Sequence, residues 1–341
     1  MEKRLIIEKT KRQRNNALDL IKFVASFFVV CIHIPFLGGD VAVAVNAAAR
    51  FAVPTFFAIS GFYAFGADAA TLKRRLLKVI RLYLISSAVY HAYGIVIRIA
   101  EQGGAGFFSY ISDIFLSVGN VRSFFIFNIP FSSLHLWYLL ALIYVYLIWL
   151  LILKLSLNDK IVLFIGVSAL LANLVLGELL SAFGVVLNEA FVRNFALLGL
   201  PFFIFGYFLG KYNRLFAKIK PFYLIIAIVI GSSEAVLSRF FIGHNEVYIG
   251  SVLCCFSIVI LAEKIKHIKL LDKQIHVFRS SIDVYVLHLL FSKPLYLLAR
   301  SLPTTIGTVI VAIMPCIVFA ACIAFYLLKS VVIKYCLNLR R

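Results

Sequence analysis

The first apolar segment of the chain carries four polar side chains that share one side of a helix. Lys22 and His33 are three helical turns apart, so their directions differ by about 20°. Asp19 and Ser26 lie within about 40° of the same line. An imidazole on such a face can act as a general base towards a hydroxyl group. The alternative is structural, with Asp19 and Lys22 paired at the membrane interface and His33 bonded to a backbone carbonyl.

A second group of interest is a run of basic residues that precedes the third apolar segment. Its members recur at spacings of three and four residues, so they line the end of a helix and suit a ligand that carries phosphates. They are Lys73, Arg74, Arg75, Lys78 and Arg81. Ordinary anchoring of a membrane helix by cytoplasmic cations explains the same pattern.

Two further histidines lie in later apolar segments. His135 stands beside Trp137 where one segment begins, and His288 shares a helix face with Ser281 and Ser292. Interfacial aromatic residues and hydrogen-bonded core histidines explain many such cases. The six cysteines form no C-x-x-C pair, so we expect buried small side chains and no metal centre.

Composition indicates the solvent in which the chain folds. Hydrophobic residues make up 63% of the chain and charged residues only 14%, which is too apolar for the surface of a water-soluble protein. The formal net charge of +19 does not indicate nucleic-acid binding, because the cations stand in short clusters between apolar runs. The partner that this composition predicts is the lipid bilayer.

Hydropathy predicts an all-α, polytopic membrane bundle of about ten transmembrane helices. The predicted spans are 18–38, 47–66, 79–100, 134–153, 161–180, 194–210, 222–241, 247–262, 282–299 and 306–328. With both termini in the cytoplasm, 26 Lys and Arg residues fall inside and seven outside, as the positive-inside rule requires. We expect a single membrane domain over residues 1–341, in which a basic cytoplasmic segment, 1–17, precedes the first helix.

The longest segment predicted outside the membrane spans residues 101–133. It carries glycines together with Phe124, Phe125 and Phe127. We interpret it as an extracytoplasmic loop whose aromatic side chains suit the membrane face.

The chain resembles acyltransferase family 3 of integral membrane acyltransferases, in motifs that run in the family's order across most of its length. Its first helix resembles the family's Asp-x-x-(Arg/Lys) followed by His, here Asp19, Lys22 and His33. Residues 53–62, VPTFFAISGF, resemble the family's most specific signature. Further family counterparts are Arg75-x-x-Lys78, Leu136-Trp137-Tyr138 and Tyr285-x-x-His288. Lys22 and Lys78 stand where the family more often has arginine. Lysine cannot form the bidentate hydrogen bonds to phosphate that arginine forms.

The resemblance implies transfer of an acyl group, expected to be acetyl, from cytoplasmic acyl-CoA to a hydroxyl of a cell-envelope glycan or glycolipid. Acetyl-CoA would be the co-substrate and the bacterial cytoplasmic membrane the location, as in members without a fused extracytoplasmic domain. The expected site residues are His33, Asp19 and Lys22 for catalysis, Arg74, Arg75, Lys78 and Arg81 for CoA, and Ser60, His135, Trp137 and His288 for the substrate. His33 would act as a general base or as a covalent acyl relay.

A second interpretation is a small-molecule transporter, because the membrane domain of membrane-bound serine racemases, with its proposed role in amino-acid transport, has the same pattern. A transporter favours broken helices in a symmetric pair around a central pocket, and the Gly and Pro interruptions in this sequence form no such pair. The oligomeric state is left open by the sequence.

Overall fold

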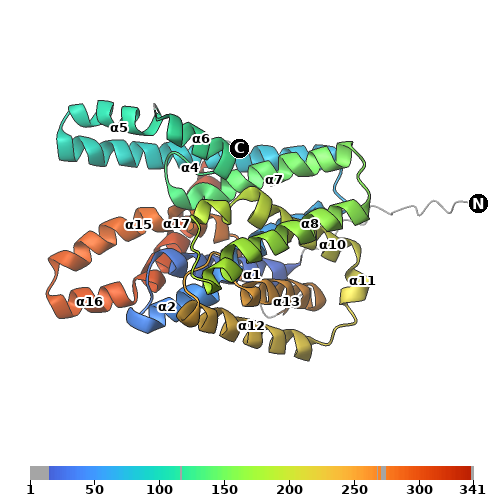
Figure 1. Ribbon diagram of the computed structural model, residues 1–341. Coiled ribbons are helices and arrows are strands. Elements are labelled where there is room, and N and C mark those ends of the chain that lie inside the picture. The colour runs from blue at the N-terminus through green and yellow to red at the C-terminus, as the bar shows by residue number, and fades with distance from the viewer. Residues whose placement is uncertain (1–14, 116, 267, 270–273, 339–341) are drawn as a thin grey trace, which may run out of the picture.

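A computed structural model describes residues 15–115, 117–266, 268–269 and 274–338, and every regular element within these ranges is a helix (Figure 1). The all-α fold class is therefore confirmed. Most of the predicted basic segment at the N-terminus, residues 1–14, lies outside the described ranges.

Within the described ranges, eight helical segments are long and apolar enough to cross a membrane. They are α1 (Asn16–His33), α2 to α3 (Gly39–Ala64), α4 (Ala69–Gln102), η2 to α7 (Leu134–Lys154), α8 to α9 (Asp159–Ala182), α12 (Pro221–Phe241), α15 (Ser281–Ser301) and α17 (Met314–Asn338, apolar over Met314–Cys336). Two shorter helical segments, η5 to α10 (Phe195–Lys211) and α13 (Ile249–Ile265), occupy the remaining two predicted places. The chain is thus a multi-pass membrane protein. The number of transmembrane helices, ten, and the side of the membrane on which each loop lies stay predictions.

The other described elements are short. Those within or beside the spanning segments are η1 (Ala49–Phe51), which joins α2 (Gly39–Ala48) to α3 (Ala52–Ala64), η2 (Leu134–Leu136), η3 (Val175–Leu179), α9 (Leu180–Ala182) and η5 (Phe195–Gly199). Those between spanning segments are α5 (Ala105–Phe115), α6 (Val118–Phe127), η4 (Glu189–Phe191), α11 (Asn213–Phe216), α14 (Ile275–Phe278) and α16 (Thr304–Ala312). Three of the segments named above combine a long helix with short elements, and their long helices are α7 (Trp137–Lys154), α8 (Asp159–Leu174) and α10 (Leu200–Lys211).

Several sequence-based boundaries differ from the structure, and the segment predicted to begin at residue 47 begins at Gly39. Helix α1 ends at His33, where the prediction ran on to residue 38. Helix α4 begins ten residues before the predicted start and has 34 residues, about 51 Å, so it extends well beyond the hydrocarbon core. The predicted span 306–328 is broken at Ile313, because Pro315 at the start of α17 cannot donate a hydrogen bond back into α16.

The predicted outer loop 101–133 is also largely helical, which corrects its interpretation as a loop. Helix α5 folds back along α4, and Figure 1 shows the two helices lying side by side. A Cβ at Gly94 would lie 2.7 Å from the ring of Tyr110, so the missing side chain lets the two helices approach.

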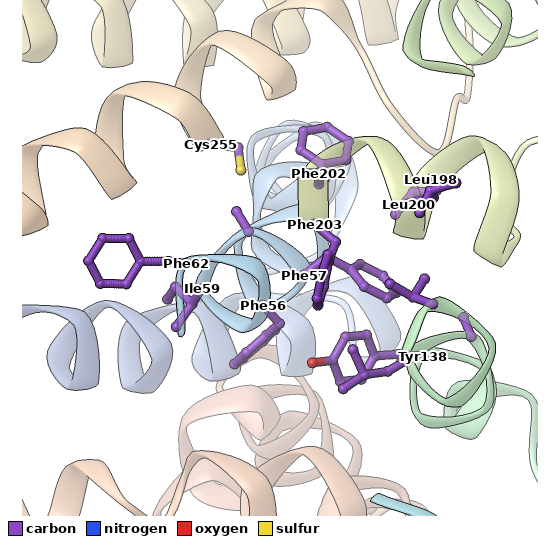
Figure 2. Close-up of a cluster of buried hydrophobic side chains, with 14 of the residues drawn as sticks. Phe56, Phe57, Ile59, Phe62, Tyr138, Leu198, Leu200, Phe202, Phe203 and Cys255 are labelled. Carbon is purple, nitrogen blue, oxygen red and sulfur yellow. The ribbon is translucent and has the colours of Figure 1, made fainter. Parts of the chain in front are cut away.

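The core forms where α3 crosses α10. A Cβ on Gly61 would lie 1.8 Å from the carbonyl oxygen of Phe203, and one on Gly206 would lie 1.7 Å from that of Ala58. The two backbones therefore touch, as small residues allow in membrane bundles. Figure 2 shows the aromatic side chains around this crossing, among them Phe57, Phe62 and Phe203. This close contact fixes α3, which carries Ser60, relative to the rest of the bundle.

Helix α1 runs through the interior of the bundle and contacts α3, α13, α15 and α17. Its start is fixed by Asn15, whose side chain accepts a hydrogen bond from Leu18 N and donates to the Glu263 carboxylate at the end of α13. The polar face predicted for α1 is thereby held among packed helices.

Candidate active site

A cavity of about 280 Å³ opens between α1, α3, α4, α7 and α15. It brings together four residues predicted for the site, Lys22, Ser60, Arg75 and Lys78. The rest of its wall is largely apolar and aromatic, including Tyr63, Leu142 and Tyr146. The cavity thus combines a cationic rim with an apolar interior, which suits a ligand with an anionic head and an uncharged arm.

Two of the rim cations are held by neighbouring groups. Lys22 Nζ lies 2.7 Å from the Asp19 carboxylate, as the helical spacing predicted. Arg75 donates to the carbonyl oxygen of Tyr63 and so joins α4 to the end of α3. Lys78 is exposed at the rim.

The other two cations predicted to bind the donor do not line this cavity. Arg74 and Arg81 are exposed on α4, and Arg74 donates to the hydroxyl of Thr71. They lie on the same helix as the rim and add positive charge near it. The structure therefore separates Arg75 and Lys78 from Arg74 and Arg81, which the sequence treated alike.

Tyr285 of α15 lies at the inner end of the cavity. Its hydroxyl donates to the backbone carbonyl of His135, and its ring lies 5.4 Å from that of Tyr138. His288 follows one helical turn after Tyr285, about 5 Å along the axis. Tyr285 therefore links the wall of the cavity to the segments that carry His135 and His288.

His33, His135 and His288 form one cluster, although they lie more than 100 residues apart in the chain. The ring centroids are 5.2 Å apart for His33 and His288, 5.0 Å for His135 and His288, and 6.3 Å for His33 and His135. The three segments that carry these histidines, α1, η2 and α15, meet where α1 ends. The structure thus joins the residue predicted as the base to two residues predicted for the substrate.

Hydrogen bonds define the tautomers of two of these rings. His288 Nδ1 lies 2.8 Å from the carbonyl oxygen of Tyr285 and 3.1 Å from that of Val284, so Nδ1 carries the proton. Its Nε2 lone pair is buried and has no hydrogen-bond partner among the described residues. His135 accepts from the Ser133 hydroxyl at 2.9 Å, and its Nε2 is 3.4 Å from the carbonyl of Val286.

Accessibility distinguishes His33 from its neighbours. His135 and His288 are buried, at 1% and 0% exposure, whereas His33 remains exposed although protein surrounds it on most sides. His33 therefore borders accessible space at the end of α1, where a second substrate can reach it. Ser26, two turns earlier, donates to the carbonyl of Phe23 at 2.7 Å.

The remaining predicted residues lie around this cluster. Ser60 lines the cavity and donates to the carbonyl of Phe56, and Trp137 lies below the guanidinium of Arg193, 5.9 Å from the ring centroid. The sequence analysis did not single out Tyr90, whose hydroxyl donates to Val286 and whose ring lies 4.8 Å from His135. Nothing in its local sequence distinguishes Tyr90 from the other tyrosines of the chain.

The fold and this site define a multi-pass membrane protein in which a cavity with a cationic rim and a cluster of three histidines are linked through Tyr285. A family model described as an acyltransferase domain matches residues 15–329. The chain therefore belongs to acyltransferase family 3, and the protein is a membrane acyltransferase. No curated protein and no solved structure matches the chain.

Proposed function

We propose that the protein transfers an acetyl group from cytoplasmic acetyl-CoA to a hydroxyl of a cell-envelope glycan or glycolipid, in the bacterial cytoplasmic membrane. The observation that carries this proposal is the cavity that brings Lys22, Arg75 and Lys78 together and is also lined by Tyr285, whose hydroxyl donates to the backbone of His135 in the histidine cluster. Its cations suit the phosphates of CoA, and its apolar wall suits the pantetheine arm.

In this proposal the two substrates approach from opposite sides. The thioester reaches the inner end of the cavity near Tyr285, and the acceptor hydroxyl reaches His33 from the accessible side. The hydroxyl oxygen attacks the thioester carbonyl while His33 takes its proton. The carbon–sulfur bond then breaks, an ester forms, and the proton passes to the departing thiolate of CoA.

Asp19 supports this arrangement by holding Lys22 at the rim. His288 and His135 would help to position the reacting groups, because their rings pack around His33 and their protons are held by backbone carbonyls. Membership of the acyltransferase family favours group transfer over the transport interpretation. An acyl-histidine relay remains compatible with the same residues.

The test compares envelope glycans from cells with and without the gene by mass spectrometry. We expect an ester-linked acetyl group that is present only with the gene, and that mild alkali removes. Purified protein in liposomes should release CoA from acetyl-CoA when the identified glycan is added. Identical glycans in both strains, together with no CoA release, would contradict the proposal.

A further inference from the structure

A group of charged side chains lies beside His33 at the end of α1. Asn46 of α2 donates to the carbonyl oxygen of Ile32 at 3.0 Å and accepts from Arg50 at 2.9 Å. Arg50 is thus connected through Asn46 to the backbone of Ile32, the residue next to His33. We name Arg50, Arg193, Glu189, His244 and Glu246 the outer polar cluster.

The outer polar cluster has a buried side and an accessible side. Arg50 and Glu246 pair at 3.0 Å, and their side chains are each only 7% exposed. Arg193 reaches Glu246 at 3.4 Å and Glu189 at 2.8 Å, while 48% of the Glu189 side chain is exposed. Burial alone would raise the pKa of the Glu246 carboxyl, but Arg50, His244 and Arg193 hold that pKa far below its usual value. Glu246 therefore stays ionised.

Internal ion pairing does not use all the hydrogen-bonding capacity of the cluster. Arg50 Nε is buried without a partner among the described residues. Glu189, His244 and Glu246 offer ligand atoms within 4.8 Å of one another, as a metal site does. A bound cation would, however, lie next to the guanidinium groups of Arg50 and Arg193, which repel it.

We propose that the outer polar cluster binds the acceptor as a neutral, hydroxyl-rich sugar unit and presents one hydroxyl to His33. This inference rests on the proposed acyl transfer and specifies its acceptor. The cluster contains two arginines and two glutamates, so its formal charges balance while His244 is neutral. Guanidinium groups only donate hydrogen bonds and carboxylates only accept them.

A sugar diol matches this set because each hydroxyl both donates and accepts. It can accept from Arg193 and donate to Glu189 or Glu246 without leaving a charge unpaired. An anionic acceptor offers mainly acceptor atoms, so it would face the two carboxylates unfavourably and compete with them for the arginines. Charge balance thus favours a neutral glycan over a uronic acid or a phosphorylated one.

Tryptophan fluorescence tests this site without requiring turnover. The chain has two tryptophans, and Trp137 lies below Arg193. Trp149 is buried against Phe203 and Tyr207, and its indole N–H has no partner within the described ranges, so Trp149→Phe removes no hydrogen bond. In that background Trp137 reports on ligands that contact Arg193.

We expect neutral trisaccharides (maltotriose, cellotriose and triacetylchitotriose) to include at least one that changes the Trp137 emission saturably, and trigalacturonic acid to bind more weakly. Arg193→Lys and Glu246→Gln should each raise the dissociation constant of that sugar about tenfold or more, the scale of a lost charge-assisted hydrogen bond. Arg122→Lys and Glu101→Gln, at exposed positions elsewhere, are the matched controls and should change it less than twofold.

Acetyl-CoA binding and acetyl-CoA hydrolysis without acceptor are measured in the same preparations. If Glu246→Gln fails to fold, Arg193→Lys decides the result. The proposal is overturned if no neutral sugar binds, if trigalacturonic acid binds more tightly, or if both variants bind as the controls do. Saturable sugar binding in a protein that neither binds nor uses acetyl-CoA would overturn the proposed transfer while supporting the sugar site.

Discussion

At the scale of single residues, the structure distinguishes His33, the histidine predicted as the base, from the two histidines predicted for the substrate. His288 and His135 are buried, and carbonyl groups hold their protons, whereas His33 borders accessible space. A base must contact the hydroxyl from which it takes a proton, so accessibility favours His33. The rings of His288 and His33 pack with their centroids 5.2 Å apart, so His288 limits the orientations that the His33 ring can take.

His33→Ala should therefore lower acetyl transfer about 10²-fold or more, the scale of a lost general base. Acetyl-CoA binding should be nearly unchanged, because Lys22 at the rim lies about 16 Å away from His33 along α1. Transfer and binding are measured on the same purified variant. His91→Gln, in the outer hairpin beside Tyr110, is the control. Near-normal turnover in His33→Ala beside an inactive His288→Ala would move the base to His288.

The rim cations allow a matched comparison on one helix. Lys78→Glu should weaken acetyl-CoA binding about tenfold or more, because a charge-assisted contact to phosphate is worth about 1.5–3 kcal/mol. Arg74→Glu changes the charge equally at an exposed position that does not line the cavity, so its effect should be smaller. Calorimetric titration in detergent measures both. Equal losses would mean that the field of the whole basic run, and not contact with the ligand, attracts CoA.

At the scale of elements, the crossing of α3 and α10 determines where Ser60 and the cavity lie. The serine and glycine of the S-G-F signature have different roles there. Ser60 faces the cavity, and Gly61 lets the backbone of α10 come into contact. A conspicuous stretch of sequence thus combines a site residue with a packing residue.

Gly61→Ala should destabilise the protein by about 3 kcal/mol, near the upper end of the cost of overpacking, since its Cβ would meet a backbone atom that cannot rotate away. Gly104→Ala, where nothing lies within 4 Å of the added carbon, is the control. Thermal unfolding in detergent measures both. A melting temperature for Gly61→Ala equal to that of Gly104→Ala would show that the two helices do not cross this closely.

At the scale of the whole molecule, the proposed mechanism requires the acetyl-CoA site and the acceptor site to face opposite sides of the membrane. The cationic rim must face the cytoplasm and the outer polar cluster the opposite side. Both follow if the N-terminus is cytoplasmic and the chain crosses the membrane ten times.

Cysteine labelling tests this arrangement directly. In a background with Cys316→Ser and Cys336→Ser, which removes the two exposed thiols among the described residues, single cysteines are placed in turn. Cysteines at 104 and 243 should react with a membrane-impermeant reagent in intact cells, and cysteines at 70 and 215 only after lysis. Tags at both termini should report as cytoplasmic. A C-terminus outside would require an odd number of helices and would place one of these two sites on the opposite side of the membrane.

The sequence by itself determined the class of the protein and most of its helices, and it predicted the residues that would carry chemistry. Hydrophobicity and charge bias act locally, so apolar runs predict spans and basic clusters predict sides. The polar face of α1 also follows from local geometry, and the observed pair of Asp19 and Lys22 agrees with it. The family signature near Gly61 predicted the acyltransferase membership.

Only the tertiary structure decided which of these residues meet. The histidine cluster joins α1, the start of α7 and α15, and the cavity joins five helices, so both depend on how the helices pack. Such contacts arise from side-chain shape at crossings like Gly61 and Phe203, which no local pattern encodes. For the same reason the sequence could not separate Lys78 from Arg74 or relate Arg50 to Glu246, nearly 200 residues later, because each pair is distinguished only by its three-dimensional neighbours.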